Sequence, residues 1–255
     1  MKDQHEQWQY LVQLLAPQRG EVILDLGCGS GKGMLHLLNS SRVQKVVGLD
    51  ISEEAIERAK RRLARYVRID RAELILDDAS RGLPFGRGAF DAVLSAELIE
   101  CLGEAAQRRL LREVHRVLKP GGRILVEHTD WDTQLWSASD RQLERKLVHA
   151  FCDWKQAWMQ HSDGWMGRNL LGLFRRAKLF TRVKVSAHTL INDRYKPGTF
   201  GYARSQDLIP LARKGKRARL GDVRRFIRDM RARDRAKSYF YSVNRFVVTA
   251  TKKGS

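Results

Sequence analysis

The sequence predicts an α/β fold in which a mostly parallel sheet of seven strands carries helices on both faces. Three observations lead to this prediction: short apolar runs of five or six residues, strongly periodic helices between them, and a glycine-rich turn directly after the first run. Short continuous apolar runs are typical of strands that are buried on both faces. Strands that alternate with helices favour βαβ units with right-handed crossovers.

The elements are expected in a regular order along the first half of the chain. Helices at 3–16, 34–40, 53–66 and 104–118 alternate with strands at 22–26, 45–50, 72–79, 90–97 and 123–130. Ser52 is the expected N-cap of the third helix, because its hydroxyl can accept a backbone N–H. The sequence Lys119-Pro120-Gly121-Gly122 is a strong helix breaker and predicts the end of the fourth helix.

The pattern changes after Asp130. Helices are expected at 138–160 and 166–178, alternating strands at 182–191 and 241–251, and a basic helical insert at about 195–238. The chain shows no internal repeat and no Pro- or Ser-rich linker. It therefore predicts one domain over residues 1–255, with a core at 20–130 and the insert as a lid over the carboxyl edge of the sheet.

Composition narrows the class of protein. Apolar residues make up 43% of the 255 residues and charged residues 30%, which fits a folded protein and excludes a disordered one. No apolar run approaches the roughly 20 residues that span a bilayer, and the first residues show no apolar signal region. The expected location is cytoplasmic. Cys28, Cys101 and Cys152 are too sparse for a disulfide framework or a zinc site, so no metal ligand is assigned.

The positive charge is confined to the second half of the chain. Residues 1–130 hold 20 Lys or Arg and 19 Asp or Glu, whereas residues 131–255 hold 28 and 10. Twelve of these basic residues lie at 213–237, where Val223, Phe226, Ile227 and Met230 recur at helical spacing. Three interpretations remain open for this amphipathic helix: a lid over an acceptor pocket, a contact with an anionic membrane surface, and an RNA-binding element.

The glycine-rich turn Asp25-Leu-Gly27-Cys28-Gly29-Ser-Gly31-Lys-Gly33 carries the chemistry. A dinucleotide site would need a third glycine at position 32 or 34, and these positions hold Lys32 and Met34. A P-loop is excluded because Leu26 and Gly33 stand where it needs glycine and Ser or Thr. A ligand with a cationic amino-acid end and no phosphate suits this loop. Strand-end carboxylates at Asp50 and Asp78 suit a ribose and an adenine.

With these residues in place, the chain resembles class I S-adenosylmethionine-dependent methyltransferases, and the order and spacing are similar to the ubiquinone/menaquinone and bacterial small-molecule group. The five segments that carry the resemblance cover roughly residues 20–130: VILDLGCGSGKG, GLD ending at Asp50, LDDA, FDAVLSAELIECL and REVHRVLKPGGRILV. The resemblance implies a Rossmann-like fold, a cofactor-binding core at 20–130 and S-adenosyl-L-methionine as the cofactor. One departure is Cys101 after Glu100, where the group often has histidine.

The resemblance also implies a role for each motif residue. Gly27, Cys28, Gly29 and Gly31 would line the methionine part of the cofactor, Asp25 would serve its ammonium group, and Ser95 would border it. Asp50 would hold the ribose, Ile51 would pack on the adenine, and Asp78 with Ala79 would read the adenine amine.

The acceptor is less well defined. His128, Asp130 and Trp131 end the fifth strand, where His128 or Asp130 could act as a base and Trp131 could pack on an aromatic or cationic group. We expect a small-molecule acceptor, with anionic, aromatic and lipid-like acceptors all open. An RNA methyltransferase and a non-catalytic nucleoside-binding protein are the alternatives.

Overall fold

The apolar strand runs form the centre of the molecule. The computed structural model describes residues 2–40, 43–156, 159–214 and 218–253. Its sheet has the order β3-β2-β1-β4-β5-β8-β6, with β7 pairing on β8. The strands are β1 Val22–Leu26, β2 Lys45–Asp50, β3 Ala72–Leu76, β4 Phe90–Ala96, β5 Leu118–Thr129, β6 Leu135–Trp136, β7 Phe180–Asn192 and β8 Tyr241–Lys252.

The first five long strands run parallel, and β8 is antiparallel to both β5 and β7. The Rossmann-like, mostly parallel α/β fold expected from the sequence is therefore confirmed. The short β6 was not expected, because two residues carry no periodicity.

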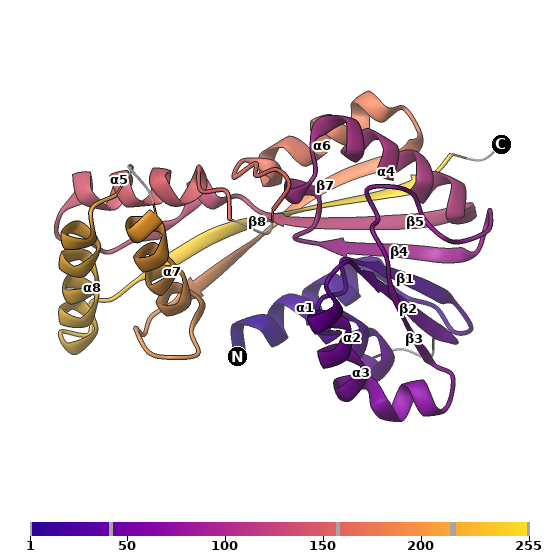
Figure 1. Ribbon diagram of the computed structural model, residues 1–255, viewed down its shortest axis with the longest axis horizontal. Helices are drawn as coiled ribbons and strands as arrows, with labels where there is room; N and C mark the ends of the chain where they lie inside the picture. The colour runs from indigo at the N-terminus through magenta and orange to yellow at the C-terminus, as the bar shows by residue number, and fades with distance from the viewer. Residues whose placement is uncertain (1, 41–42, 157–158, 215–217, 254–255) are drawn as a thin grey trace.

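The helices cover both faces of the sheet, as Figure 1 shows. One face packs against α4 and α6, and the other packs against α1, α2 and α3. The helices are α1 Lys2–Leu15, α2 Lys32–Ser40, α3 Glu53–Arg68, α4 Glu104–Val117, α5 Arg141–Cys152, α6 Met166–Ala177, α7 Phe200–Lys214 and α8 Leu220–Arg235. Short 3₁₀ turns lie at Ile99–Cys101 and Trp131–Thr133. The Ser52 hydroxyl accepts from Ala55 N, so the predicted N-cap is confirmed.

Three boundaries differ clearly from the expectation. The strand expected at 123–130 is β5, which already begins at Leu118 and so includes Lys119-Pro120-Gly121-Gly122. The helix expected at 138–160 is only α5, because the chain leaves the helix at Asp153. Residues 157 and 158 of that stretch lie outside the described residues. The strand expected at 72–79 ends at Leu76, which leaves Asp77 and Asp78 in the following loop.

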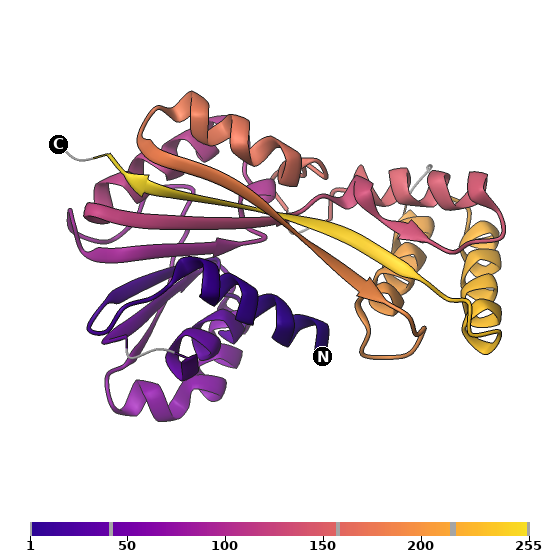
Figure 2. The ribbon, with the colours of Figure 1, turned by 180° about the vertical axis from the view of Figure 1, so that it is seen from behind.

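The strands β7 and β8 continue beyond the parallel sheet as a twisted ribbon, which Figure 2 shows from behind. Its far end carries a distal lobe, made of β6, α5, α7, α8 and the adjoining ends of β7 and β8. This lobe has a hydrophobic core of its own, in which Phe226 and Met230 of α8 meet Trp136 and Leu147. The apolar face of the basic helix α8 is therefore buried in the core of the distal lobe. The role of the insert as a lid over the acceptor pocket stays a prediction. Among the described residues, no helix is long and apolar enough to cross a bilayer.

Candidate functional site

The turn between β1 and α2 depends on three glycines with left-handed backbone. Gly27, Gly29 and Gly31 have φ of 72°, 52° and 73°, a region that other L-residues enter only with strain. A Cβ on Gly31 would lie 3.0 Å from Leu63 Cδ1, so this glycine also lets the turn approach α3. The Gly27 amide donates to Leu49 O at 2.8 Å and holds the turn against β2.

A cleft of about 270 Å³ opens beside this turn, at the carboxyl ends of four neighbouring strands. Ligands of open α/β sheets bind at this edge. The cleft is lined by Gly27, Leu49, Asp50, Ile51, Ser52, Asp77, Asp78, Ala79, Ser80, Glu97, Leu98, Cys101, Leu102 and Gln160. Five of the residues that the sequence assigned to the cofactor are among them: Gly27, Asp50, Ile51, Asp78 and Ala79.

The Asp50 carboxylate is fixed by the backbone. Its Oδ2 accepts from Gly29 N at 2.8 Å and its Oδ1 accepts from Ser52 N at 2.9 Å. Each oxygen keeps a lone pair for a further donor, such as a ribose hydroxyl. Ile51 next to it keeps 62% of its surface exposed in the cleft, which leaves an apolar face for a flat ring.

Asp78 occupies the loop after β3. Its Oδ1 accepts from Ser80 N at 2.9 Å, and its Oδ2 lies 3.5 Å from Arg81 Nε. Ala79 is 7% exposed and completes this wall of the cleft. The lining of the cleft therefore combines four acidic residues, Asp50, Asp77, Asp78 and Glu97, with an apolar surface, and it includes no basic residue.

The other residues assigned to the cofactor do not line the cleft. Asp25 is 2% exposed below the turn, and its Oδ2 has no hydrogen-bond partner. Burial, together with the charge of Asp50, raises the pKa of Asp25 to about 7. Ser95 is buried and its hydroxyl donates to Leu26 O at 3.2 Å. Cys28 is buried, and Gly29 and Gly31 shape the turn.

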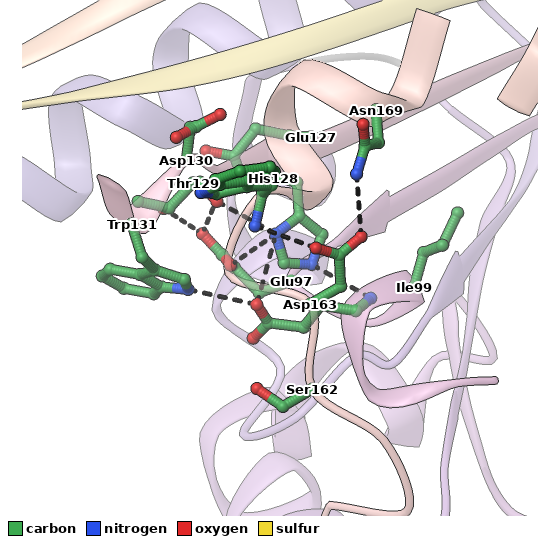
Figure 3. A network of polar contacts seen from close by, with 12 residues as sticks. Glu97, Ile99, Glu127, His128, Thr129, Asp130, Trp131, Ser162, Asp163 and Asn169 are labelled. Atoms are coloured by element: carbon green, nitrogen blue, oxygen red, sulfur yellow. Dashed lines mark hydrogen bonds and ion pairs between the residues drawn. The ribbon is translucent and has the colours of Figure 1, made fainter. Parts of the chain in front are cut away.

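Beyond the cleft, carboxylates and an imidazole form the network in Figure 3. Glu97 follows β4 with φ of 58°, a strained conformation for a residue with a side chain. Its Oε1 accepts from Thr129 N at 3.1 Å and also from the Thr129 hydroxyl. Its Oε2 lies 3.2 Å from His128 Nδ1. Glu97 belongs both to this network and to the wall of the cleft.

The protonation of His128 follows from its neighbours. The backbone N–H of Glu100 can only donate, and it points to Nε2 at 3.4 Å, so the ring proton belongs on Nδ1. Nδ1 then faces acceptors only, at Glu97 Oε2, Glu100 Oε2 and Thr129 O. Burial opposes a charged imidazole, but the surrounding carboxylates outweigh it and raise the pKa of His128.

Glu97, Glu100 and His128 offer ligand atoms within 4.8 Å of one another, the spacing of a metal site. A proton on Nδ1 removes this nitrogen as a ligand, so the geometry favours a proton-bonded network over a metal centre. Glu100 is 4% exposed, and burial raises the pKa of this carboxyl to about 7.

The other two residues assigned to catalysis, Asp130 and Trp131, contact different parts of the structure. Asp130 is fully buried, and both of its oxygens accept from the Arg168 guanidinium at 2.6 Å. This geometry favours a structural role for Asp130. Trp131 donates from Nε1 to Glu100 Oε2 at 3.1 Å and stacks on Phe200 of the distal lobe, with ring centroids 6.2 Å apart. His128 and Trp131 thus meet in the network, whereas Asp130 points to α6.

Glu97 and Glu100 are not predicted from the sequence as functional residues. A carboxylate directly after β4 was the available signal for Glu97, because that strand ends at the same sheet edge as β1 and β2. Nothing in the sequence pattern indicates that Glu100 turns back to His128.

A Rossmann-like sheet with a glycine-rich turn after β1, a carboxylate after β2 and a cleft whose lining includes no basic residue is typical of nucleoside-binding folds. Residues 23–122 match the family model of the methyltransferase domain. This segment, about two fifths of the chain, is therefore similar in sequence to a methyltransferase domain.

The individual relatives agree with this assignment. The chain is 40% identical over 109 residues to a demethylmenaquinone methyltransferase of Symbiobacterium thermophilum, which covers 42% of this chain and 41% of the relative. The YcgJ protein of Bacillus subtilis has the same fold, with a TM-score of 0.61 and 17% sequence identity. The match covers 98% of this chain and 100% of YcgJ. Phosphoethanolamine N-methyltransferase 2 of Haemonchus contortus, solved with S-adenosyl-L-methionine, has a TM-score of 0.56 and 17% sequence identity. The match covers 97% of this chain and 52% of that protein. The chain spans about half the length of the curated relatives it matches first.

Proposed function

We propose that the protein transfers a methyl group from S-adenosylmethionine to a small-molecule acceptor. The observation that carries the proposal is the cleft, because it presents Asp50, Asp78 and exposed Ile51 and has no basic residue among its lining residues. When bound, the cofactor would supply an electrophilic methyl group on a sulfonium. Asp50 would hold the ribose hydroxyls, Ile51 would cover the adenine, and Asp78 with Ala79 would face its amine.

Transfer of a methyl group from a sulfonium needs little acid catalysis, because the leaving group is neutral. Proximity and orientation of the two reactants therefore give most of the rate enhancement. The chain must hold the acceptor in line and, where the nucleophile carries a proton, remove it. Glu97 is the group we assign to this task. Its carboxylate borders the cleft, is held by Thr129 and lies beside His128 Nδ1, which fixes its direction.

Binding of the cofactor is tested with Asp50→Ala. Loss of a fixed carboxylate that receives two hydroxyls should weaken binding of S-adenosylhomocysteine more than tenfold in calorimetry. Asp70→Asn is the control, because Asp70 is exposed, pairs with Lys45 at the protein surface and has a φ of 53° that asparagine tolerates. Equal affinity of the Asp50 variant and the wild type would refute the ribose role.

The role of Glu97 is tested with Glu97→Gln, which keeps the shape of the side chain. Release of S-adenosylhomocysteine is followed with methyl-labelled cofactor and the small-molecule fraction of a source-cell extract. We expect a loss of roughly 100-fold or more in turnover, the usual contribution of a positioned base, with product affinity within threefold of wild type. Glu104→Gln, at an exposed position on α4, should change neither. Undiminished turnover by Glu97→Gln would contradict the assignment.

The same extract separates the alternatives. Label that enters only the RNA fraction would favour an RNA acceptor, and absence of transfer to either fraction would favour the non-catalytic nucleoside-binding protein. Label in a small molecule supports the proposed function.

A further inference from the structure

We propose that α8 carries a binding surface for the phosphodiester backbone of a double-helical nucleic acid. The surface is an arginine stripe, defined as Arg224, Arg228, Arg231 and Arg235. This inference does not rest on the proposed methyl transfer, because the stripe shares no residue with the cleft or the network around His128.

The four arginines share one side of the helix. Their spacing of four, three and four residues places them within about 60° of arc around the helix axis and over a length of about 16 Å. All four are exposed. The stripe therefore presents a row of guanidinium groups that a single extended partner can contact together.

The charge of the stripe is not neutralised by the protein. Among the described residues, none of the four arginines forms an ion pair with a carboxylate. The three acids of α8 are engaged elsewhere: Asp222 with Lys146 at 2.8 Å, Asp229 with Ser139 N at 2.7 Å and Asp234 with Tyr195 N at 2.9 Å. Two other arginines of α8, Arg225 and Arg233, lie within 3.7 Å of Asp222 and Asp229, whereas the stripe keeps its full positive charge.

The apolar face of α8 decides between two kinds of anionic surface. A helix that lies in a membrane needs a free apolar face to insert below the headgroups. Val223, Phe226 and Met230 are at most 1% exposed, and Phe226 packs edge-on against Trp136 with ring centroids 5.3 Å apart. With this face buried in the distal lobe, α8 can offer only its charge, which favours a polyanion in solution.

The residue types point to phosphates. Arginine presents two parallel N–H groups to a phosphate, and all four positions of the stripe are arginine. No aromatic side chain stands within the stripe to stack on a base, so we expect binding that ignores sequence. Figure 1 shows α8 at the outer end of the distal lobe, away from α1, α2 and α3. A long rigid partner can therefore reach it.

The test measures binding of the full chain to a 24-base-pair DNA duplex by fluorescence anisotropy over a range of salt concentrations. Each phosphate contact contributes about 0.9 to the slope of log affinity against log salt. Arg224→Gln/Arg231→Gln should lower the slope by about 1.8 and the affinity at ~0.1 M salt by roughly 50-fold. Arg61→Gln/Arg68→Gln removes two exposed arginines from α3 and should change the affinity less than twofold.

Each outcome decides the proposal. Two unrelated duplex sequences should bind equally, and Arg224→Lys/Arg231→Lys should keep the salt slope because the charge remains. Equal binding by the wild type and the Arg224→Gln/Arg231→Gln variant, with matching thermal unfolding, would exclude the stripe. Failure of the wild type to bind the duplex, together with binding to phosphatidylserine vesicles, would assign the stripe to a lipid surface and overturn the proposal.

Discussion

Replacement of Asp25 by asparagine should make the protein relatively more stable as the pH rises. Asp25 is 2% exposed, one of its oxygens has no hydrogen-bond partner, and its pKa is raised from 3.8 to about 7. A raised pKa in the folded state means that the folded chain holds this proton more tightly than the unfolded chain. The contribution of Asp25 to the stability of the wild type therefore falls as the pH rises from about 4 through 7, where the buried carboxyl must ionise.

The size of the effect follows from the two pKa values. Because the unfolded chain ionises Asp25 more readily than the folded chain, the raised pKa lowers the free energy of unfolding by about 2 kcal/mol at pH 5.5 and about 4 kcal/mol at pH 8. Asparagine does not titrate, and its new N–H groups add a cost that is the same at both pH values. The difference in free energy of unfolding between Asp25→Asn and wild type should thus shift by about 2 kcal/mol in favour of the variant between pH 5.5 and 8.

Urea unfolding of both proteins at the two pH values, without cofactor, measures this shift. Other buried groups that titrate in this range, such as Glu100, occur in both proteins and cancel in the difference. An equal difference in stability at pH 5.5 and pH 8 would show that Asp25 is ionised at no cost, and the reasoning from its burial would fail.

Three further predictions concern other parts of the structure. Asp130→Ala should lower the free energy of unfolding by about 2 kcal/mol, because Arg168, which is 39% exposed and also contacts Asp132, loses its two short hydrogen bonds to Asp130; urea unfolding checks this, and a loss of product affinity without a loss of stability would contradict the structural role. Gly31→Ala should cost at least about 1 kcal/mol more than Gly29→Ala, since both have positive φ but only Gly31 has close neighbours; similar unfolding midpoints would disagree. Burial raises the pKa of Cys101 and of Cys152 to about 12, so both thiols should react with a disulfide reagent at pH 7.5 far more slowly than after unfolding; rapid labelling of the folded protein would argue against their burial.

Local pattern was enough to predict most of the core. The apolar runs at β1 and β2 and the periodic α3 with Ser52 at its N-terminus stand where the sequence places them, because each is determined by short-range spacing. The distal lobe could not be predicted in the same way. An alternating strand pattern indicates β7 and β8, but it does not show that both strands leave the sheet and carry a second core.

The site shows the same limit. The glycine turn and Asp50 are local signals, and the sequence located them. Asp130 looked like a base because it ends β5, but its partner Arg168 stands 38 residues later and no local pattern reveals the pair. Glu97 and His128 come from different strands, so only the folded sheet brings them together.

The most direct test of the account is calorimetric titration of the purified chain with S-adenosylmethionine, NAD and ATP under the same conditions. The cleft predicts one S-adenosylmethionine per chain and no measurable uptake of the two phosphate-bearing ligands. Binding of NAD or ATP in preference to S-adenosylmethionine would contradict the assignment of the cleft.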